Sequence, residues 1–159
     1  MHRILELLEK NADLTAAEIA VMLDADEKEV AKAIEAYRAE GVIIGKRTMV
    51  DWQKTDREYV TAMIELKVSP QFGKGFDEIA ERCWQFDKVQ TVYLMSGGFD
   101  LMLIVEGRTL TEVALFVSEN LAPMDQVLST TTHFVLKKYK EDGMLLTQPQ
   151  KDERSVMML

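Results

Sequence analysis

The chain has 159 residues, of which 47% are apolar and 29% are charged, and its formal net charge is −8. No apolar run approaches the roughly 18 residues that a membrane span requires, and the N-terminal segment has helical periodicity and acidic residues rather than the pattern of a signal peptide. The single cysteine, Cys83, excludes an intramolecular disulfide and a multi-cysteine zinc site. These features predict a cytoplasmic protein without a metal or cofactor, and the acidic balance argues against tight nonspecific binding to nucleic acid.

Three short helices are predicted in the first forty residues. The first covers residues 3–10, and the second begins at Thr15, which forms a capping box with Glu18. The third covers Asp26 to Glu40 and ends at Gly41, which suits a helix C-terminus. Their predicted buried stripes are formed by the apolar residues Ile4, Leu5, Leu8, Ile19, Met22, Leu23, Val30, Ile34 and Tyr37. Such a trio with a tight second turn is typical of a helix-turn-helix.

A small hairpin, or wing, is predicted after the third helix. Its strands would be Val42–Ile44 and Arg47–Val50, with the basic pair Lys46-Arg47 at the tip. Residues 1–50 are therefore interpreted as a winged helix-turn-helix domain, with a plain three-helix interaction domain as the alternative. Residues 51–58 are polar and aperiodic, and we interpret them as a linker.

From residue 59 the apolar period changes from 3.6 to 2. A strand ending at Val68 is followed by a helix that includes Cys83, a hairpin over Val89–Gly107, a helix beginning at Thr109 and a last strand over Val127–Tyr139. The order βαββαβ over residues 59–142 predicts a ferredoxin-like α+β domain. Residues 143–159 form a C-terminal tail that the pattern does not place.

The hairpin over Val89–Gly107 has two unusual features. It is apolar on both faces, so we expect the face that the helices do not cover to pack against a second copy of the chain. Its Gly97-Gly98 pair predicts a type I′ turn, and Asp100 follows as the only charge between Lys88 and Glu106. That carboxylate either caps the turn backbone or binds a polar ligand.

Three segments carry a family resemblance: YLMSGGFDLMLIVEG at 93–107, EGRTLTEVALFV at 106–117 and STTTHFVLKKYKEDG at 129–143. With AEGVIIG at 39–45, they lie in the order found in the leucine-responsive/asparagine regulator (Lrp/AsnC) family, and the chain resembles that family over residues 3–142. The resemblance implies a homodimer that can assemble into octamers, paired domains that bind double-stranded DNA, and an effector, an amino acid or related metabolite, bound between C-terminal domains.

The resemblance also assigns candidate site residues. The family's G-x-D effector pattern matches Gly98-Phe99-Asp100, and the start of the last strand lies near the partner's turn. The carboxylate of Asp100 can pair with the ammonium group of an amino-acid effector. Glycine N–H groups and hydroxyls can donate hydrogen bonds to the carboxylate of the effector. The expected effector residues are Met95, Gly97, Gly98, Phe99, Asp100, Ser129, Thr130, Thr131 and Thr132. The expected DNA contacts are the cations of the third helix and the wing: Lys28, Lys32, Arg38, Lys46 and Arg47.

Two other functions compete with this interpretation. The predicted recognition helix holds five acids against three bases, which suits an amino-acid sensor or protein-interaction module that has lost its contact with DNA. Some proteins of this two-domain fold decarboxylate tetrapyrroles with histidine and arginine. The chain has only two histidines, His2 and His133, and no catalytic or metal-ligand spacing, so no catalytic residue is assigned.

Overall fold

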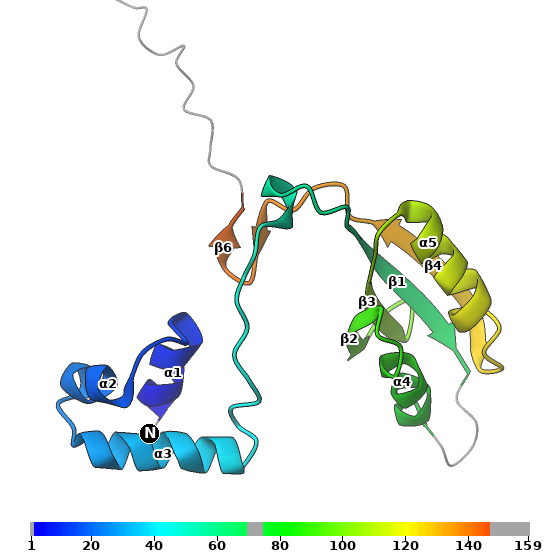
Figure 1. Cartoon of the computed structure of the whole chain (residues 1–159). Coiled ribbons are helices and arrows are strands. Elements are labelled where there is room, and N and C mark those ends of the chain that lie inside the picture. Colours follow the sequence, from blue (N-terminus) through cyan, green and yellow to red (C-terminus); the bar gives the residue numbers. More distant parts are fainter. Residues whose placement is uncertain (1, 70–74, 147–159) are drawn as a thin grey trace, which may run out of the picture. The chain divides into compact units, whose positions relative to one another are not determined.

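The computed structural model describes residues 2–69 and 75–146. The chain divides into two compact units between Val50 and Asp51, and each unit is described by itself (Figure 1).

The N-terminal unit consists of three helices, α1 (His2–Lys10), α2 (Ala16–Leu23) and α3 (Glu27–Ala39). The predicted capping box is present: the Thr15 hydroxyl accepts the Glu18 N–H, and the Glu18 carboxylate accepts the Thr15 N–H. Asp26 caps α3 by accepting the N–H groups of Lys28 and Glu29 at 2.9 and 3.1 Å. Both helix starts are therefore fixed by local sequence, as expected.

The core of this unit contains Ile4, Ile19, Ala20, Val30 and Ile34, all buried. The expectation that Met22 is buried was wrong, because Met22 is 55% exposed and Ala20 is buried instead. Successive residues of a helix are rotated by about 100°, so burying Ala20 turns Met22 outward.

The predicted wing hairpin is not formed. Residues 44–50 contain no strand, and the N–H groups of Val42 and Ile43 both donate to the Tyr37 carbonyl, at 2.8 and 3.0 Å. Gly41 makes this turn possible with a φ of +72°. The first residues of the expected strand therefore close the end of α3 and are not part of a strand.

The C-terminal unit contains β1 (Val60–Val68), α4 (Asp77–Trp84), β2 (Val89–Leu94), β3 (Leu101–Gly107), α5 (Leu110–Phe116), η2 (Val117–Leu121) and β4 (Val127–Phe134). The four strands form one antiparallel sheet in the order β2-β3-β1-β4. Helices α4 and α5 lie on the same face of this sheet (Figure 1). The predicted βαββαβ fold is confirmed.

Alternation in the strands builds the core beneath the helices. Ile64, Leu66, Leu101, Leu103 and Val105 are almost fully buried on one sheet face. The helices contribute the buried side chains Ile79, Cys83, Val113, Phe116, Val117 and Leu121. At the end of β3, a Cβ at Gly107 would lie 2.8 Å from Cγ2 of Val113. Glycine at this position therefore allows α5 to approach the sheet.

The position of the type I′ turn was predicted wrongly. Strand β2 ends at Leu94 and β3 begins at Leu101, so a longer loop joins them, and neither Gly97 nor Gly98 has a positive φ. Two successive positive φ angles instead occur at Asp142 and Gly143, at 44° and 83°. They join the short strands β5 (Lys140–Glu141) and β6 (Met144–Leu145).

The last long strand is also shorter than predicted, since β4 ends at Phe134 rather than Tyr139. The β5–β6 hairpin continues the folded chain past residue 142, where the sequence placed the start of a tail; residues 147–159 of that tail lie outside the described residues.

The expected linker, residues 51–58, has structure of its own. A 3-10 turn, η1 (Trp52–Lys54), is followed by Arg57, whose guanidinium lies 4.3 Å from the centre of the Trp52 ring. In the described ranges, no helix has both the length and the apolar character needed to cross a membrane.

Candidate effector and DNA-binding sites

The loop between β2 and β3 is anchored at both ends by backbone hydrogen bonds. The N–H of Met95 donates to the Asp100 carbonyl at 2.8 Å and closes the loop, and the N–H of Asp100 donates to the Leu66 carbonyl at 3.0 Å. The side chain of Asp100 adds a third bond, because its Oδ2 accepts the N–H of Val68 at 2.8 Å. The loop is thereby joined to the end of β1.

This third bond revises the two roles that the sequence left open for Asp100. Its carboxylate does cap backbone, but the backbone is that of the adjacent strand and not that of its own turn. The register of β1 against β4 shifts between Lys67 and Val68. The Asp100 carboxylate therefore accepts a hydrogen bond from a backbone N–H at the point where the strand pairing is irregular. The other oxygen, Oδ1, has no hydrogen-bond partner within residues 2–69 and 75–146. Asp100 can therefore cap β1 and still offer one oxygen to a ligand.

The hydroxyls of the last strand alternate between the two faces of the sheet. Ser129 and Thr131 are exposed, whereas Thr130 and Thr132 are half-buried on the side of the helices. Leu66 pairs with Leu101 on one side and with Thr130 on the other. These hydroxyls and the β2–β3 loop therefore lie at the same end of the sheet, but β1 separates them by two strand spacings, about 10 Å. One chain by itself does not bring the two halves of the expected effector site together.

The sheet face that the helices leave uncovered is apolar in part. Tyr93, Met102, Ile104 and Met63 alternate with the core residues, and Tyr93 is 55% exposed and Met63 38% exposed. A polar pair borders them.

This pair was not anticipated from the sequence. Nε2 of His133 lies 3.0 Å from Oε1 of Glu65, across β1 and β4. The period of β1 could have revealed it, because Glu65 and His133 both occupy the phase opposite to the core residues.

Lys28 and Lys32 lie on the exposed face of α3. They are four residues apart, so they project from the same side of the helix, opposite the buried Val30 and Ile34. Glu35 lies on the same face and forms an ion pair with Arg38 at 2.5 Å. The exposed face of α3 therefore presents two cations and one carboxylate.

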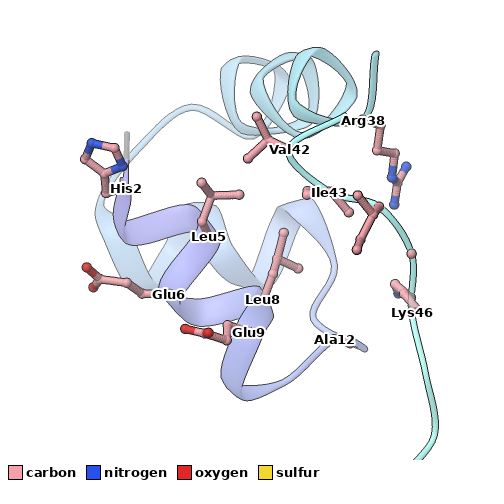
Figure 2. A pocket seen from close by; sticks show the side chains of 12 residues that line it. His2, Leu5, Glu6, Leu8, Glu9, Ala12, Arg38, Val42, Ile43 and Lys46 are labelled. Atoms are coloured by element: carbon pink, nitrogen blue, oxygen red, sulfur yellow. The ribbon is translucent and has the colours of Figure 1, made fainter. Parts of the chain in front are cut away.

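Arg38 and Lys46 lie apart from those two lysines. They line a hollow of about 530 Å³ between α1 and the chain that follows α3. Figure 2 shows Leu5, Leu8 and Val42 around the hollow, with Glu6 and Glu9 on the α1 side and Arg38 and Lys46 on the other. Ten residues of helix separate Lys28 from Arg38, roughly 15 Å, so the candidate cations on α3 are spread along the helix.

Cys83 is unsuited to nucleophilic chemistry. The thiol is buried in the core beneath the helices, and this burial raises its pKa to about 11, with Arg82 opposing the shift weakly. A thiol in that environment stays protonated at neutral pH.

The known proteins that share this arrangement identify the family. Residues 61–145 match the Lrp/AsnC ligand binding domain, and residues 2–44 match a winged helix-turn-helix DNA-binding domain. The chain belongs to the Lrp/AsnC family. A Bacillus subtilis relative described as an uncharacterized HTH-type transcriptional regulator, YugG, is 46% identical over 155 residues, covering 97% of this chain and 93% of the relative.

Two further similarities agree with this assignment. The HTH-type transcriptional regulator LrpA of Pyrococcus horikoshii is 30% identical over 137 residues, covering 86% of this chain and 94% of its own. The fold is similar to that of a Neisseria meningitidis transcriptional regulator solved in complex with L-Met, with a TM-score of 0.70 and 19% identity over 87% of this chain and 88% of the other. This Lrp/AsnC chain is a DNA-binding transcriptional regulator with a domain for a small-molecule effector, and its relatives are named as regulators rather than enzymes.

Proposed function

We propose that this Lrp/AsnC regulator binds a free amino acid at the loop Met95–Asp100 and that the bound amino acid changes its assembly or its affinity for DNA. The observation that carries the proposal is the geometry of Asp100. One carboxylate oxygen is held by the Val68 N–H, which fixes the side chain, and the other has no hydrogen-bond partner among the described residues. A fixed carboxylate beside exposed glycine backbone suits the ammonium and carboxylate of an amino acid.

The remaining effector contacts come from a second copy in this proposal. Within one chain, β1 lies between the loop and the hydroxyls of Ser129–Thr132. A two-fold dimer that joins the uncovered sheet faces would bury Met63, Tyr93, Met102 and Ile104, and would bring the loop of one copy to β4 of the other. Phe99 is half-buried in the loop, and Met95, Gly97 and Gly98 are exposed. We propose that the dimer is the building block and that octamers form from dimers. We also propose that the protein acts in the cytoplasm.

DNA contact is assigned to the exposed cations of the N-terminal unit. Lys28 and Lys32 on α3 would face the major groove, and Arg38, Lys46 and Arg47 would contact phosphates at its border. Few cations take part, so we expect modest affinity and a slope of log K against log salt of at most about 0.9 per cation that contacts a phosphate.

The alternative, a sensor that has lost its contact with DNA, is not favoured by the relatives, which are HTH-type regulators. The observation in its favour is Glu35, which lies on the exposed face of α3 and neutralises Arg38. A carboxylate facing a phosphate backbone is repelled by it.

Two measurements on the full chain separate these functions. Fluorescence anisotropy with fragments of the source genome at about 50 mM salt tests DNA binding, and thermal unfolding in the presence of each of the twenty amino acids tests effector binding. One effective amino acid should stabilise the protein by about 2.7 kcal/mol at a hundredfold excess over its Kd. Specific DNA binding together with such stabilisation supports the proposal. Stabilisation without DNA binding supports the sensor. If neither effect is observed, both functions are rejected.

A further inference from the structure

A second hollow lies in the C-terminal unit, away from the β2–β3 loop. Its volume is about 240 Å³, and it lies between the segment 52–61 and the chain that follows β4. Among the described residues, the lining includes three cations, Arg57, Lys137 and Lys138, and no acidic residue. In a chain with a net charge of −8, this concentration of positive charge is unusual. It is also continuous with a basic stretch of sequence, LKKYK at 136–140.

Two of the three cations have no counter-ion in the described part of the chain. Arg57 lies over the Trp52 ring, and Nζ of Lys137 lies 4.9 Å from the centre of the Tyr139 ring. Contact with an aromatic face orients a guanidinium but leaves the N–H groups at its edge free to donate. Both cations are therefore held in place with unused hydrogen-bond donors.

The third cation, Lys138, is already paired with a carboxylate and is part of the lining of the hollow. Nζ of Lys138 donates to Oε1 of Glu141 at 2.7 Å, and the side chain is only 16% exposed. Burial alone would lower the pKa of Lys138, but its hydrogen bonds to Glu141 and Tyr59 outweigh burial and raise the pKa above its ordinary value. The Tyr59 hydroxyl in turn accepts the hydroxyl of Thr61 at 2.8 Å. The two sides of the hollow are joined by the Val135 N–H, which donates to the Thr61 carbonyl at 2.9 Å, and by Nζ of Lys138, which lies 5.3 Å from the centre of the Tyr59 ring.

We propose that this hollow binds a phosphate group, with Arg57 and Lys137 as its ligands. Arg57 and Lys137 have no carboxylate partner in the described part of the chain, and two such cations match a dianion better than the single charge of a carboxylate. The guanidinium edge can hold two oxygens of one phosphate. The phosphate can belong to inorganic phosphate or to a small phosphomonoester, and the size of the hollow leaves room for either. This site is separate from the amino-acid site, so either can fail without the other.

The test measures binding by isothermal titration to the full chain. Inorganic phosphate, glycerol 3-phosphate and acetate are titrated at pH 7.5 and at constant ionic strength set with sodium chloride. The site predicts saturable binding of one or both phosphates and at least tenfold weaker binding of acetate. Affinity should fall at pH 5.5, because the second pKa of a phosphomonoester is about 6 and the dianion is lost. The stronger of the two phosphates identifies the source of the phosphate.

Two variants and a matched control locate the binding. Arg57→Gln and Lys137→Gln should each weaken phosphate binding about tenfold, the usual effect of removing one charged hydrogen-bond donor. Lys54→Gln removes the same charge from a nearby lysine that pairs with Asp51 and does not line the hollow, so it should bind as the parent does. Lys137 is exposed, so its variant keeps the proposal testable if Arg57→Gln fails to fold. No saturable phosphate binding, equal binding of acetate, or equal losses in Lys54→Gln and Lys137→Gln would overturn the proposal.

Discussion

The Asp100 carboxylate accepts the backbone N–H of Val68 at 2.8 Å, and this bond joins the β2–β3 loop to the end of β1. The Asp100 N–H also donates to the Leu66 carbonyl on the same strand. The Asp100 carboxylate, the proposed ligand for the effector ammonium, is therefore held in place by β1, the strand that lies between the two halves of the expected effector site. Loss of the side chain and loss of its charge should consequently have different effects.

We expect Asp100→Ala to destabilise the C-terminal unit by about 1–3 kcal/mol, because the Val68 N–H loses its acceptor. Asp100→Asn keeps an oxygen that can accept this N–H, so it should unfold within about 1 kcal/mol of the parent. Both variants should lose the stabilisation by amino acids, because neither offers a negative charge to the ammonium. Thermal unfolding with and without the effective amino acid measures both effects.

The asparagine variant decides the role of the charge. If Asp100→Asn responds to the amino acid as the parent does, the carboxylate is a strand cap only and the effector binds elsewhere. The matched control is Asp87→Asn, which removes an exposed carboxylate from the same unit and should change neither property.

Charge on the exposed face of α3 should control the affinity for DNA. Glu35→Gln removes a carboxylate and frees Arg38 from its ion pair, so DNA binding should tighten by about 1 kcal/mol, roughly fivefold. Lys32→Gln should weaken binding and reduce the slope of log K against log salt by about 0.9, as expected for one lost phosphate contact. Anisotropy titrations over a series of salt concentrations give both quantities.

The control for this experiment is Glu81→Gln, which makes the same change in net charge on an exposed residue of α4. If Glu81→Gln tightens binding as much as Glu35→Gln, the effect comes from net charge and α3 is not the contact surface.

The uncovered sheet face should control assembly. Met63 is 38% exposed and pairs with Ile104 at the centre of that face. Met63→Lys should therefore leave the monomer folded but place a charge in the proposed interface, and it should convert the dimer to monomer at micromolar concentration. Sedimentation velocity measures the change in mass.

The matched control is Leu110→Lys, because Leu110 is 53% exposed on α5, on the side of the sheet that carries the helices. It should remain assembled. A parent protein that is already monomeric, or equal dissociation of both variants, would contradict this interface.

The ion pair between Lys88 and Glu112, at the start of α5, should affect how the stability of the protein depends on pH. A hydrogen bond from Lys88, followed by one from the Arg108 N–H, lowers the pKa of Glu112 below its ordinary value. A lowered folded pKa contributes stability above the unfolded pKa of about 4.3, and that stability is lost as the pH falls through the folded pKa. The parent should therefore lose its advantage over Glu112→Gln between about pH 5 and pH 3.

Thermal midpoints of the two proteins from pH 7 to pH 3 test this expectation. Glu119→Gln, an exposed position in the following turn, should run parallel to the parent throughout. A constant difference between the parent and Glu112→Gln at every pH would show that the charge of Glu112 does not matter.

Local sequence was sufficient wherever a structure depends on neighbouring residues. Thr15 and Asp26 mark the starts of α2 and α3, because a cap needs only the backbone of the next turn. The apolar period of 2 predicted from residue 59 agrees with β1, in which Ala62, Ile64, Leu66 and Val68 are buried, because a strand with one covered side places its apolar residues at every second position. The order of elements then followed, and with it the βαββαβ fold.

Features that depend on distant residues were not predictable from the sequence. Gly97-Gly98 has the composition of a type I′ turn, but Asp100 binds β1 and the loop takes another form; the turn lies at Asp142-Gly143. The wing failed because Tyr37 accepts both N–H groups that would begin its first strand.

The sequence by itself determined the family, the two units and the presence of a carboxylate in an apolar hairpin. Only the tertiary structure decided what that carboxylate does, because its partner, Val68, is 32 residues away. It also separated the loop from Ser129–Thr132 by β1, and it gathered Arg57 and Lys137 around one hollow. Strand pairing sets which side chains meet across a sheet, and pairing is a property of the whole fold that no local pattern contains.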